Sequence, residues 1–400
     1  MRQLAHRGLP LAALAAVAPV LAVPAPQALV VVLAVAGLWA AVQAAMARSP
    51  ICDRQVMICA AVLAGLAALT AFWSIDAKAA VATALRTGAL ALPAACLLRA
   101  ARELEPQGRR WIAWGLAIGL VLAGLLLLAE YVGPQVVGRL VHRDLLLGKS
   151  VANRSTSLVV MLMCPAFLAL ARSASLKVAA AVAAVAIAGV LASDNSTAQL
   201  ALVVALAMAG LVRNLGPRLI APTRMLVVAA VLAASLMTLA IPDPQRSYEQ
   251  WGWKHTSLHH RLTIWRFVGA RIAEHPLRGW GMDAARVLPG ADDKVVIVAA
   301  GGSRRLSEQV LPLHPHNAVL QVWLELGLGG ALAMAAVLWM LLGKTLSPPD
   351  RKSAAAATAT LAAAVLIACS SYGLWQGWWQ AALWIAAVLV AATTCRPEKT

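Results

Sequence analysis

The residues from His314 to Gly330 place side chains capable of chemistry at the start of a long apolar run. The sequence His314-Pro315-His316-Asn317 precedes the run, and Glu325 lies within it. An imidazole at the point where an apolar helix meets water is a functional candidate, because such a position is costly for a titratable group. A neutral imidazole can accept a proton from a hydroxyl group. We interpret His316 either as a general base or, equally, as a residue that caps the helix with Asn317.

The composition is that of a polytopic membrane protein. Of 400 residues, 61% are hydrophobic and only 13% are charged. Runs of about 20 apolar residues can cross a bilayer core of roughly 30 Å. We therefore predict an all-α fold with about twelve transmembrane helices, at about 9–25, 27–47, 55–73, 80–98, 111–131, 155–171, 176–193, 197–212, 223–241, 315–343, 354–371 and 375–393.

Basic residues in the short loops predict the orientation of these helices. With the N-terminus inside, every short inner loop carries Lys or Arg, as does the C-terminus with Arg396 and Lys399, whereas the short outer turns contain only Lys78. Both termini are therefore expected to be cytoplasmic. The predicted division is helices 1–9 in 1–241, with a short basic outer loop at 131–154, then a large outer loop at 242–314, and helices 10–12 with the C-terminus in 315–400.

The large loop is basic and is expected to contain a helix. Leu258, Leu262, Trp265, Val268 and Ile272 recur at spacings of three and four, which predicts a helix over 257–274 with one apolar face. Arg261 lies beside this face. The basic residues of the loop, including Lys254 and Arg304, indicate either an anionic ligand or attraction to anionic lipid head groups.

The sequence lacks the motifs of several classes of enzyme. The chain contains no GxxxxGK[ST] nucleotide loop, no HExxH and no GxSxG. His314 and His316 are two residues apart and do not share a helical face, so we expect no metal site and no cofactor. Guanidinium groups bind phosphate oxygens in a bidentate manner, which suits a diphosphate leaving group beside a histidine base. Such a reaction needs neither metal nor nucleotide, and nothing here indicates nucleic acid.

The sequence resembles the O-antigen ligase and polymerase superfamily of bacterial envelope proteins. The resemblance is carried by His316-Asn317, Leu320, Glu325 and Gly327 at the start of a late helix. A second block lies in the loop before it, and weaker similarities lie at Trp73-Ser74-Ile75 and Asn153-Arg154. The second block comprises Arg261-x-x-x-Trp265 and His275-Pro276-Leu277-x-Gly279-Trp280-Gly281.

The resemblance implies a GT-C-like glycosyltransferase of the bacterial inner membrane. It would act in the periplasm on a glycan carried by undecaprenyl diphosphate, with inversion and without metal, and a ligase would use the lipid A–core oligosaccharide as acceptor. His316 would be the catalytic base and Arg261 would bind the diphosphate. The residues expected to bind substrate around them are Asn153, Arg154, Arg266, Asn317 and Glu325.

Other functions remain open at this stage. A polymerase or a protein O-oligosaccharyltransferase of the same superfamily would use the same helix, and a transporter of lipid-linked glycan would use the same basic loops. Many relatives have a Ser-Arg pair where this chain reads Ser193-Asp194-Asn195-Ser196. If that arginine binds donor phosphate elsewhere, Arg154 or Arg266 must replace it here. For Glu325, pairing inside the bundle is as well supported as catalysis, and Asn317 is expected to cap rather than react.

Overall fold

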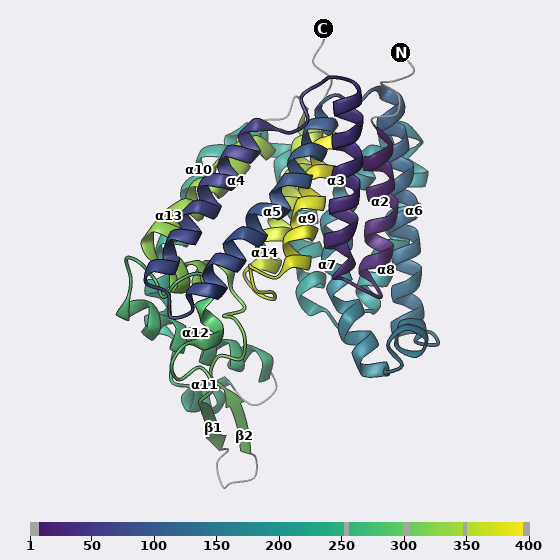
Figure 1. The fold of residues 1–400 in the computed structure, drawn as a ribbon. Helices are drawn as coiled ribbons and strands as arrows, with labels where there is room; N and C mark the ends of the chain where they lie inside the picture. The colour runs from purple at the N-terminus through teal and green to yellow at the C-terminus, as the bar shows by residue number, and fades with distance from the viewer. Residues whose placement is uncertain (1–7, 252–255, 299–304, 347–349, 395–400) are drawn as a thin grey trace.

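The protein is described here from a computed structural model of residues 8–251, 256–298, 305–346 and 350–394. Lys254, Arg304, Arg396 and Lys399, which contribute to the predicted charge pattern, lie outside these residues. Within the described residues, twelve apolar helices are present, and they form a bundle (Figure 1). They are α2 (Leu9–Ala22), α3 (Ala28–Met46), α4 (Arg54–Leu69), α5 (Ala77–Arg102), α6 (Pro106–Tyr131), α7 (Leu145–Ser173), α8 (Leu176–Ala192), α9 (Ser196–Leu215), α10 (Ile220–Met237), α13 (Ala318–Leu346), α14 (Arg351–Ala368) and α15 (Gly377–Thr394).

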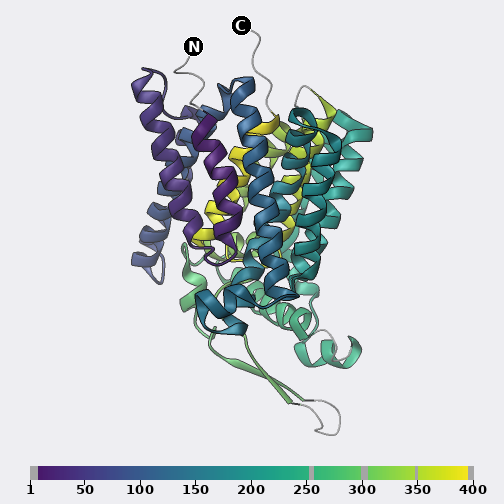
Figure 2. The ribbon, with the colours of Figure 1, turned by 90° about the vertical axis from the view of Figure 1, so that its right-hand side faces the viewer.

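The predicted polytopic membrane fold is confirmed. Among the described residues, 10 helical segments are long and apolar enough to cross a membrane, and Leu9–Ala22 and Leu176–Ala192 are shorter apolar helices. Each of the twelve helices overlaps one predicted span. The chain enters α2 and leaves α15 at the same end of the bundle, opposite the segment between α10 and α13 (Figures 1 and 2).

Small residues allow the helices of the bundle to approach closely. A Cβ atom added to Gly119 of α6 would lie 2.4 Å from the carbonyl oxygen of Ala15 in α2. One added to Gly124, farther along α6, would lie 2.8 Å from the carbonyl oxygen of Val185 in α8. Van der Waals packing across such glycines is a main source of helix association in membranes, so these contacts explain the Gly- and Ala-rich composition of α2, α6 and α8.

The predicted loop at 131–154 is largely helical, which corrects that boundary. Residues Val137–His142 form the π-helix η3, and α7 already begins at Leu145. The Asp144 side chain accepts hydrogen bonds from the backbone N–H groups of Leu146 and Leu147 and so caps α7. Asn153 and Arg154 therefore lie within α7 rather than at its start.

The segment between α10 and α13 forms a small domain at one end of the bundle. It contains α11 (Pro244–Trp251), α12 (Thr256–Glu274), the 3₁₀ turn η6 (Ala284–Val287) and the strands β1 (Lys294–Val298) and β2 (Arg305–Gln309). The strands pair antiparallel, with Lys294 opposite Gln309 and Val298 opposite Arg305. This hairpin, which extends away from the bundle, is an addition to the predicted all-α fold (Figures 1 and 2).

The predicted helix over 257–274 is present as α12, but its buried face differs from the predicted one. Val268 and Ile272 are buried as expected, whereas Leu258 is 47% exposed. His259 and Ile264 are buried instead. His259 is held in the interior because its ring stacks on Tyr248 and its Nδ1 atom bonds with the Ser247 hydroxyl, so a polar residue takes part of the buried face.

A break in α13 fastens this domain to the bundle. Gly327 has a non-helical backbone with a φ of 62° and a ψ of −155°. The N–H of Leu328 donates to the carbonyl oxygen of Pro276, while Trp280 N–H and Gly281 N–H donate to the carbonyl oxygens of Leu324 and Glu325, each at 2.9 Å. The loop thus satisfies polar backbone groups at the break, where a lipid environment could not.

Two glycines with left-handed backbones make this junction possible. Gly279 has a φ of 68°, and a Cβ atom there would lie 2.4 Å from the carbonyl oxygen of Glu325. A Cβ atom at Gly327 would lie 2.4 Å from the carbonyl oxygen of Leu277. The two glycines that carry part of the family resemblance are therefore required by backbone conformation and by close approach.

Replacing either glycine by alanine should destabilise the protein. We expect Gly279→Ala and Gly327→Ala each to lower the free energy of unfolding by about 1–3 kcal/mol from backbone strain, with steric overlap adding to this. Thermal unfolding in detergent would measure the effect. Gly329→Ala is the matched control, because a Cβ atom at Gly329 would meet no atom within 4 Å. Equal unfolding temperatures for Gly327→Ala and Gly329→Ala would contradict this account of the junction.

Candidate functional site

His316 is held in an uncommon backbone conformation and in one orientation. Its φ is 53°, in the left-handed region that residues other than glycine rarely adopt. Its Nδ1 atom lies 2.6 Å from the carbonyl oxygen of Ser371. A carbonyl oxygen can only accept, so Nδ1 must carry the proton. In the neutral ring, Nε2 then keeps its lone pair and can act as a proton acceptor.

The surroundings of His316 favour this neutral form. Burial lowers the pKa of His316, and the electrostatic effects of Arg261 and His260 lower it further, whereas the hydrogen bond to Ser371 acts in the opposite direction. The direction of the shift means that the ring stays unprotonated at neutral pH. A neutral imidazole beside fixed positive charge is suited to removing a proton from a bound hydroxyl group.

Helix α12 brings Arg261 to the same place. The indole N–H of Trp265 donates to the carbonyl oxygen of Pro315 at 2.9 Å, which fixes α12 against the residue before His316. Arg261 lies one turn earlier on α12 and contributes to the electrostatic environment of His316. Burial lowers the pKa of Arg261. The ordinary pKa of arginine is so high that the guanidinium nevertheless stays charged. The structure therefore brings together the two residues predicted to be catalytic.

The turn between α14 and α15 completes the site, a role that no motif in the sequence predicts. The carbonyl oxygen of Ser371 accepts from His316, and Leu374 N–H donates to the side-chain oxygen of Gln321 at 2.9 Å. Gly373 lies against His314, because a Cβ atom at Gly373 would be 2.9 Å from the His314 ring. The only signal for this turn was a polar Ser-Tyr-Gly between two apolar runs, which by itself indicates a loop.

His314 lies in the loop before α13 and is buried against His316. It is 6% exposed, and the two imidazole rings have centroids 4.3 Å apart. The backbone N–H of His316 donates to Nδ1 of His314 at 3.2 Å. Burial lowers the pKa of His314 to about 3, with smaller contributions from His316 and Arg286. His314 is therefore a neutral hydrogen-bond acceptor for the backbone of His316.

Glu325 joins three parts of the chain through its carboxyl group. One oxygen accepts from the backbone N–H of Asp283 at 2.7 Å and from the indole N–H of Trp375. The other accepts from the Gln321 amide at 3.1 Å. The side chain is fully buried, and its partners belong to the domain after α12, the turn before α15 and α13 itself. These contacts agree with the alternative in which Glu325 pairs with other groups inside the bundle.

Trp73 and Ser74 contact the same junction from the bundle. The indole N–H of Trp73 donates to the carbonyl oxygen of Arg278 at 3.1 Å. A Cβ atom at Gly281, whose φ is 102°, would lie 2.3 Å from the side chain of Ser74. The weak similarity at Trp73-Ser74-Ile75 thus marks the surface on which the Gly279-Trp280-Gly281 turn sits.

Asn153 and Arg154 lie near the α14–α15 turn. The Asn153 amide oxygen accepts from the Tyr131 hydroxyl at 2.7 Å, and its carbonyl oxygen accepts from the Asn195 side chain at 2.9 Å. Asn195 also approaches the hydroxyl of Tyr372, with its amide nitrogen 3.5 Å away, and the charge of Arg154 affects the Tyr372 pKa, which burial raises. Arg154 is therefore close to the residue that follows Ser371.

The remaining predicted binding residues have partners within the protein. Asn317 caps α13, because its side-chain oxygen accepts from the N–H groups of Val319 at 3.0 Å and Leu320 at 3.1 Å. Arg266 lies on an exposed part of α12 and donates to the carbonyl oxygen of Ile241 at 3.0 Å. The Arg266 guanidinium is thus bonded to the backbone at Ile241, whereas the charge of Arg261 acts on His316.

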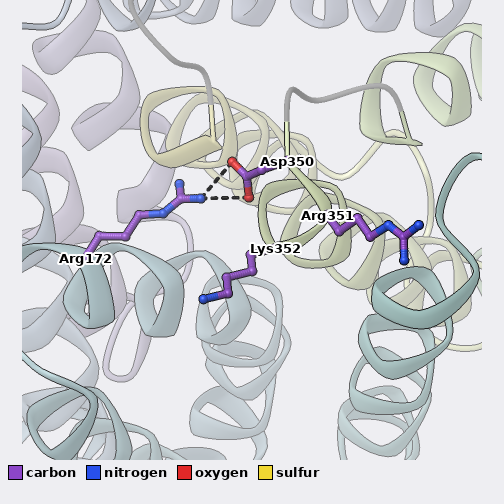
Figure 3. A pocket seen from close by; sticks show the side chains of 4 residues that line it. All are labelled: Arg172, Asp350, Arg351 and Lys352. Atoms are coloured by element: carbon purple, nitrogen blue, oxygen red, sulfur yellow. Dashed lines mark hydrogen bonds and ion pairs between the residues drawn. The ribbon is translucent and has the colours of Figure 1, made fainter.

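A separate cavity of about 430 Å³ lies at the other end of the bundle (Figure 3). It is lined by Arg172, Asp350, Arg351 and Lys352. Arg172 donates to both Asp350 oxygens at 2.9 Å, and Arg351 donates to the carbonyl oxygen of Asn214 at 3.2 Å. These contacts tie the ends of α7 and α9 to the start of α14, and the cavity is remote from His316 in the fold.

Comparisons with known proteins find similarity over part of the chain. Residues 179–335 match the family described as O-Antigen ligase. Proteins of Rickettsia conorii (strain ATCC VR-613 / Malish 7) and Rickettsia prowazekii (strain Madrid E), each named "Putative polysaccharide ligase", are both 29% identical to this chain over 164 residues. The matched part spans 40% of this chain and 39% of each relative.

The family comparison confirms the predicted resemblance over one part of the chain. The matched residues include Arg261, His316, Glu325 and both glycines of the junction, while Asn153 and Arg154 lie outside the match. The residues that carry the resemblance are therefore those that the structure gathers where α12, α13 and the α14–α15 turn meet.

Replacing Glu325 by glutamine should destabilise the region where α12, α13 and the α14–α15 turn meet. Glutamine has one acceptor oxygen where Glu325 uses two, so at least one buried donor would lose its partner at a cost of about 1–3 kcal/mol. Thermal unfolding of Glu325→Gln would show a lower midpoint than the wild type. Glu274→Gln is the control, because the Glu274 side chain is 43% exposed and pairs with Arg271 at the surface. A Glu325→Gln variant as stable as this control would contradict the structural role.

Proposed function

We propose that the protein is an O-antigen ligase, which transfers a glycan from undecaprenyl diphosphate to the lipid A–core oligosaccharide. The observation that carries this proposal is the hydrogen bond from His316 Nδ1 to the Ser371 carbonyl oxygen, which leaves Nε2 as a base in the electrostatic range of Arg261. The match of residues 179–335 to the O-antigen ligase family supports the same reaction class.

In the proposed reaction, an acceptor sugar hydroxyl attacks the anomeric carbon of the donor glycan. A new C–O bond forms as the bond from the anomeric carbon to the diphosphate oxygen breaks, which inverts the configuration. The hydroxyl proton passes to His316 Nε2, and the electron pair of the broken bond leaves with undecaprenyl diphosphate. The Ser371 carbonyl stabilises the imidazolium that forms, because it already accepts from Nδ1.

Arg261 is proposed to bind the diphosphate, and Arg154 to assist it. The half-buried guanidinium of Arg261 would be less screened by water than a surface charge, which strengthens its effect on a developing diphosphate charge. Arg154 has support from its electrostatic effect on Tyr372, which lies in the α14–α15 turn. We propose that Asn153, Asn317 and Glu325, whose observed contacts are with the protein, hold these groups in place. Arg266 is bonded to the Ile241 carbonyl oxygen, and we propose no direct role in the reaction for it.

The proposed reaction sets the orientation of the bundle in the bacterial inner membrane. The end carrying α11, α12 and the hairpin would face the periplasm, and both termini would be cytoplasmic. The inner-loop distribution of Lys and Arg supports this orientation. The donor and the acceptor are both lipid-linked, so both would reach the site from the outer leaflet of the bilayer. Neither metal nor cofactor is required by the proposed steps.

The test of this function is transfer by purified protein with undecaprenyl-diphosphate-linked glycan and rough lipopolysaccharide. His316→Ala should lower the rate by about 10²–10⁴-fold, the range for loss of a general base. His142→Ala, which removes a histidine bonded to the Pro24 carbonyl oxygen, is the control. Because burial lowers the pKa of His316 below its ordinary 6.5, wild-type activity should persist below pH 6.5 and fall only as the ring becomes protonated.

The same assay separates the alternatives. A polymerase would lengthen the lipid-linked glycan without rough lipopolysaccharide, and a protein transferase would require a protein acceptor. A transporter would move the lipid-linked glycan across vesicles without consuming it. Wild-type protein that transfers no glycan to rough lipopolysaccharide, or His316→Ala protein that transfers it normally, would overturn the proposal. Transfer that stops on addition of a chelator would contradict metal independence.

Arg261 and Arg266 offer a matched pair on one helix. We expect Arg261→Ala to lower kcat/KM for the donor by roughly 100-fold, comparable to loss of one group that stabilises transition-state charge. Arg261→Lys should retain part of the activity, because lysine keeps the charge but not the bidentate geometry. Arg266→Ala should leave kcat/KM close to wild type, since Arg266 contacts the Ile241 carbonyl oxygen. Equal losses in Arg261→Ala and Arg266→Ala would contradict a specific role for Arg261.

A further inference from the structure

We propose that His314 is a positioning residue, which holds His316 in its left-handed backbone conformation and so keeps Nε2 directed as the base. This inference rests on the proposed function, because it gives His314 a role in the same proton transfer. His314 itself is not proposed to touch substrate. Its effect passes through the backbone N–H of His316.

The conformation of His316 requires support from its surroundings. A φ of 53° brings Cβ close to backbone atoms, and a residue other than glycine stays there only when neighbouring contacts hold it. His316 N–H is directed at Nδ1 of His314, 3.2 Å away. If this bond were lost, the backbone could relax toward an ordinary φ, and the Nδ1 contact with Ser371 would be lost with it.

His314 is built into the protein as a neutral acceptor. It is 6% exposed and packs against Gly373, where any larger residue would collide with the imidazole ring. Since Nδ1 accepts from His316 N–H, the proton of the neutral ring must be on Nε2. Burial lowers the pKa of His314 to about 3, so the acceptor atom remains available throughout the neutral range.

Contacts with two elements, the α14–α15 turn and α12, fix the three residues from His314 to His316. His314 packs on the α14–α15 turn, the Pro315 carbonyl accepts from Trp265 of α12, and His316 Nδ1 donates to Ser371. The hydrogen bond from His316 N–H to His314 Nδ1 joins two residues that these contacts already hold in place. The direction of the His316 ring is thus set by two contacts, one to the side chain and one to the backbone, and His314 supplies the second.

The test compares two replacements of similar shape, of which only one can accept a hydrogen bond. In His314→Asn, the side-chain oxygen can take the place of Nδ1 as acceptor, whereas His314→Leu fills the space without any acceptor. We expect His314→Leu to lower kcat by about 10- to 100-fold with a small change in donor KM, because misplacing a catalytic group by about 1 Å can cost 100-fold. His314→Asn should recover most of this loss.

The pH profile gives a readout that a general loss of stability would not change. The charged and titratable groups that act on His316 are Arg261 and His260, and those that act on His314 are His316 and Arg286. In His314→Leu, a released and more hydrated His316 should titrate closer to 6.5, so the acid limb of kcat/KM should move to higher pH. His314→Asn should keep the wild-type limb.

A measurement that does not depend on catalysis can also be made on inactive variants. Nitrogen-15 NMR of histidine-labelled protein, with the His316 signal identified by its loss in His316→Ala, should show one tautomer protonated at Nδ1 in the wild type. His314→Leu should show a mixture of tautomers, and monodisperse elution would verify folding.

Equal kcat, pH limb and tautomer in wild type and His314→Leu would overturn the positioning role while leaving the ligase proposal intact. An inactive wild type that still shows the tautomer change would instead reject the ligase function alone.

Discussion

The break of α13 at Gly327 is the constraint on which the arrangement of the site depends. An uninterrupted helix would satisfy its own backbone and would offer no partners to the domain before it. The break opens polar backbone groups that Pro276, Trp280 and Gly281 satisfy, while the buried carboxyl group of Glu325 reaches Asp283 and Trp375. One irregular residue thereby fixes the domain against the bundle, and with it the position of α12 relative to His316.

Two elements held at this junction position the residues of the site. The fixed α12 supplies Trp265, which holds the Pro315 carbonyl, and Arg261, whose charge acts on His316. The α14–α15 turn, held at Gln321 through Leu374, supplies the Ser371 carbonyl that determines the His316 tautomer. The base and the cation are thus positioned by elements that are far apart in sequence, and the proposed glycosyl transfer uses both.

Much of this fold could be predicted because hydropathy and charge report directly on membrane spans. Every predicted span corresponds to a helix, and α12 begins within one residue of its predicted start. The predicted start of α7 lies C-terminal to the observed start, because Asp144 caps a helix whose first turns are polar or exposed. The pairing of His316 with Arg261 was predicted through family resemblance, since no local pattern connects residues on separate elements.

The roles of His314 and Ser371 could not be predicted, for a physical reason. A main-chain carbonyl carries no sequence signal, and a histidine in a polar tetrapeptide has the same appearance whether it is exposed or buried. Likewise, Glu325 in an apolar helix indicates a buried partner but not that its partners are Asp283 and Trp375. Such contacts depend on tertiary approach, which periodicity within one helix does not describe.

The attachment of the loop domain to both halves of the chain has a consequence for how the site works. The domain is bonded to Trp73 and Thr70 from the first half, and to the Leu324 and Glu325 carbonyls from the second. It therefore cannot swing open as a hinged lid without breaking hydrogen bonds at both attachments. The entropy of ordering these groups is lost during folding rather than at each turnover. The site would therefore be preorganised for the proposed lipid-linked glycan, a long and flexible substrate that must itself be immobilised.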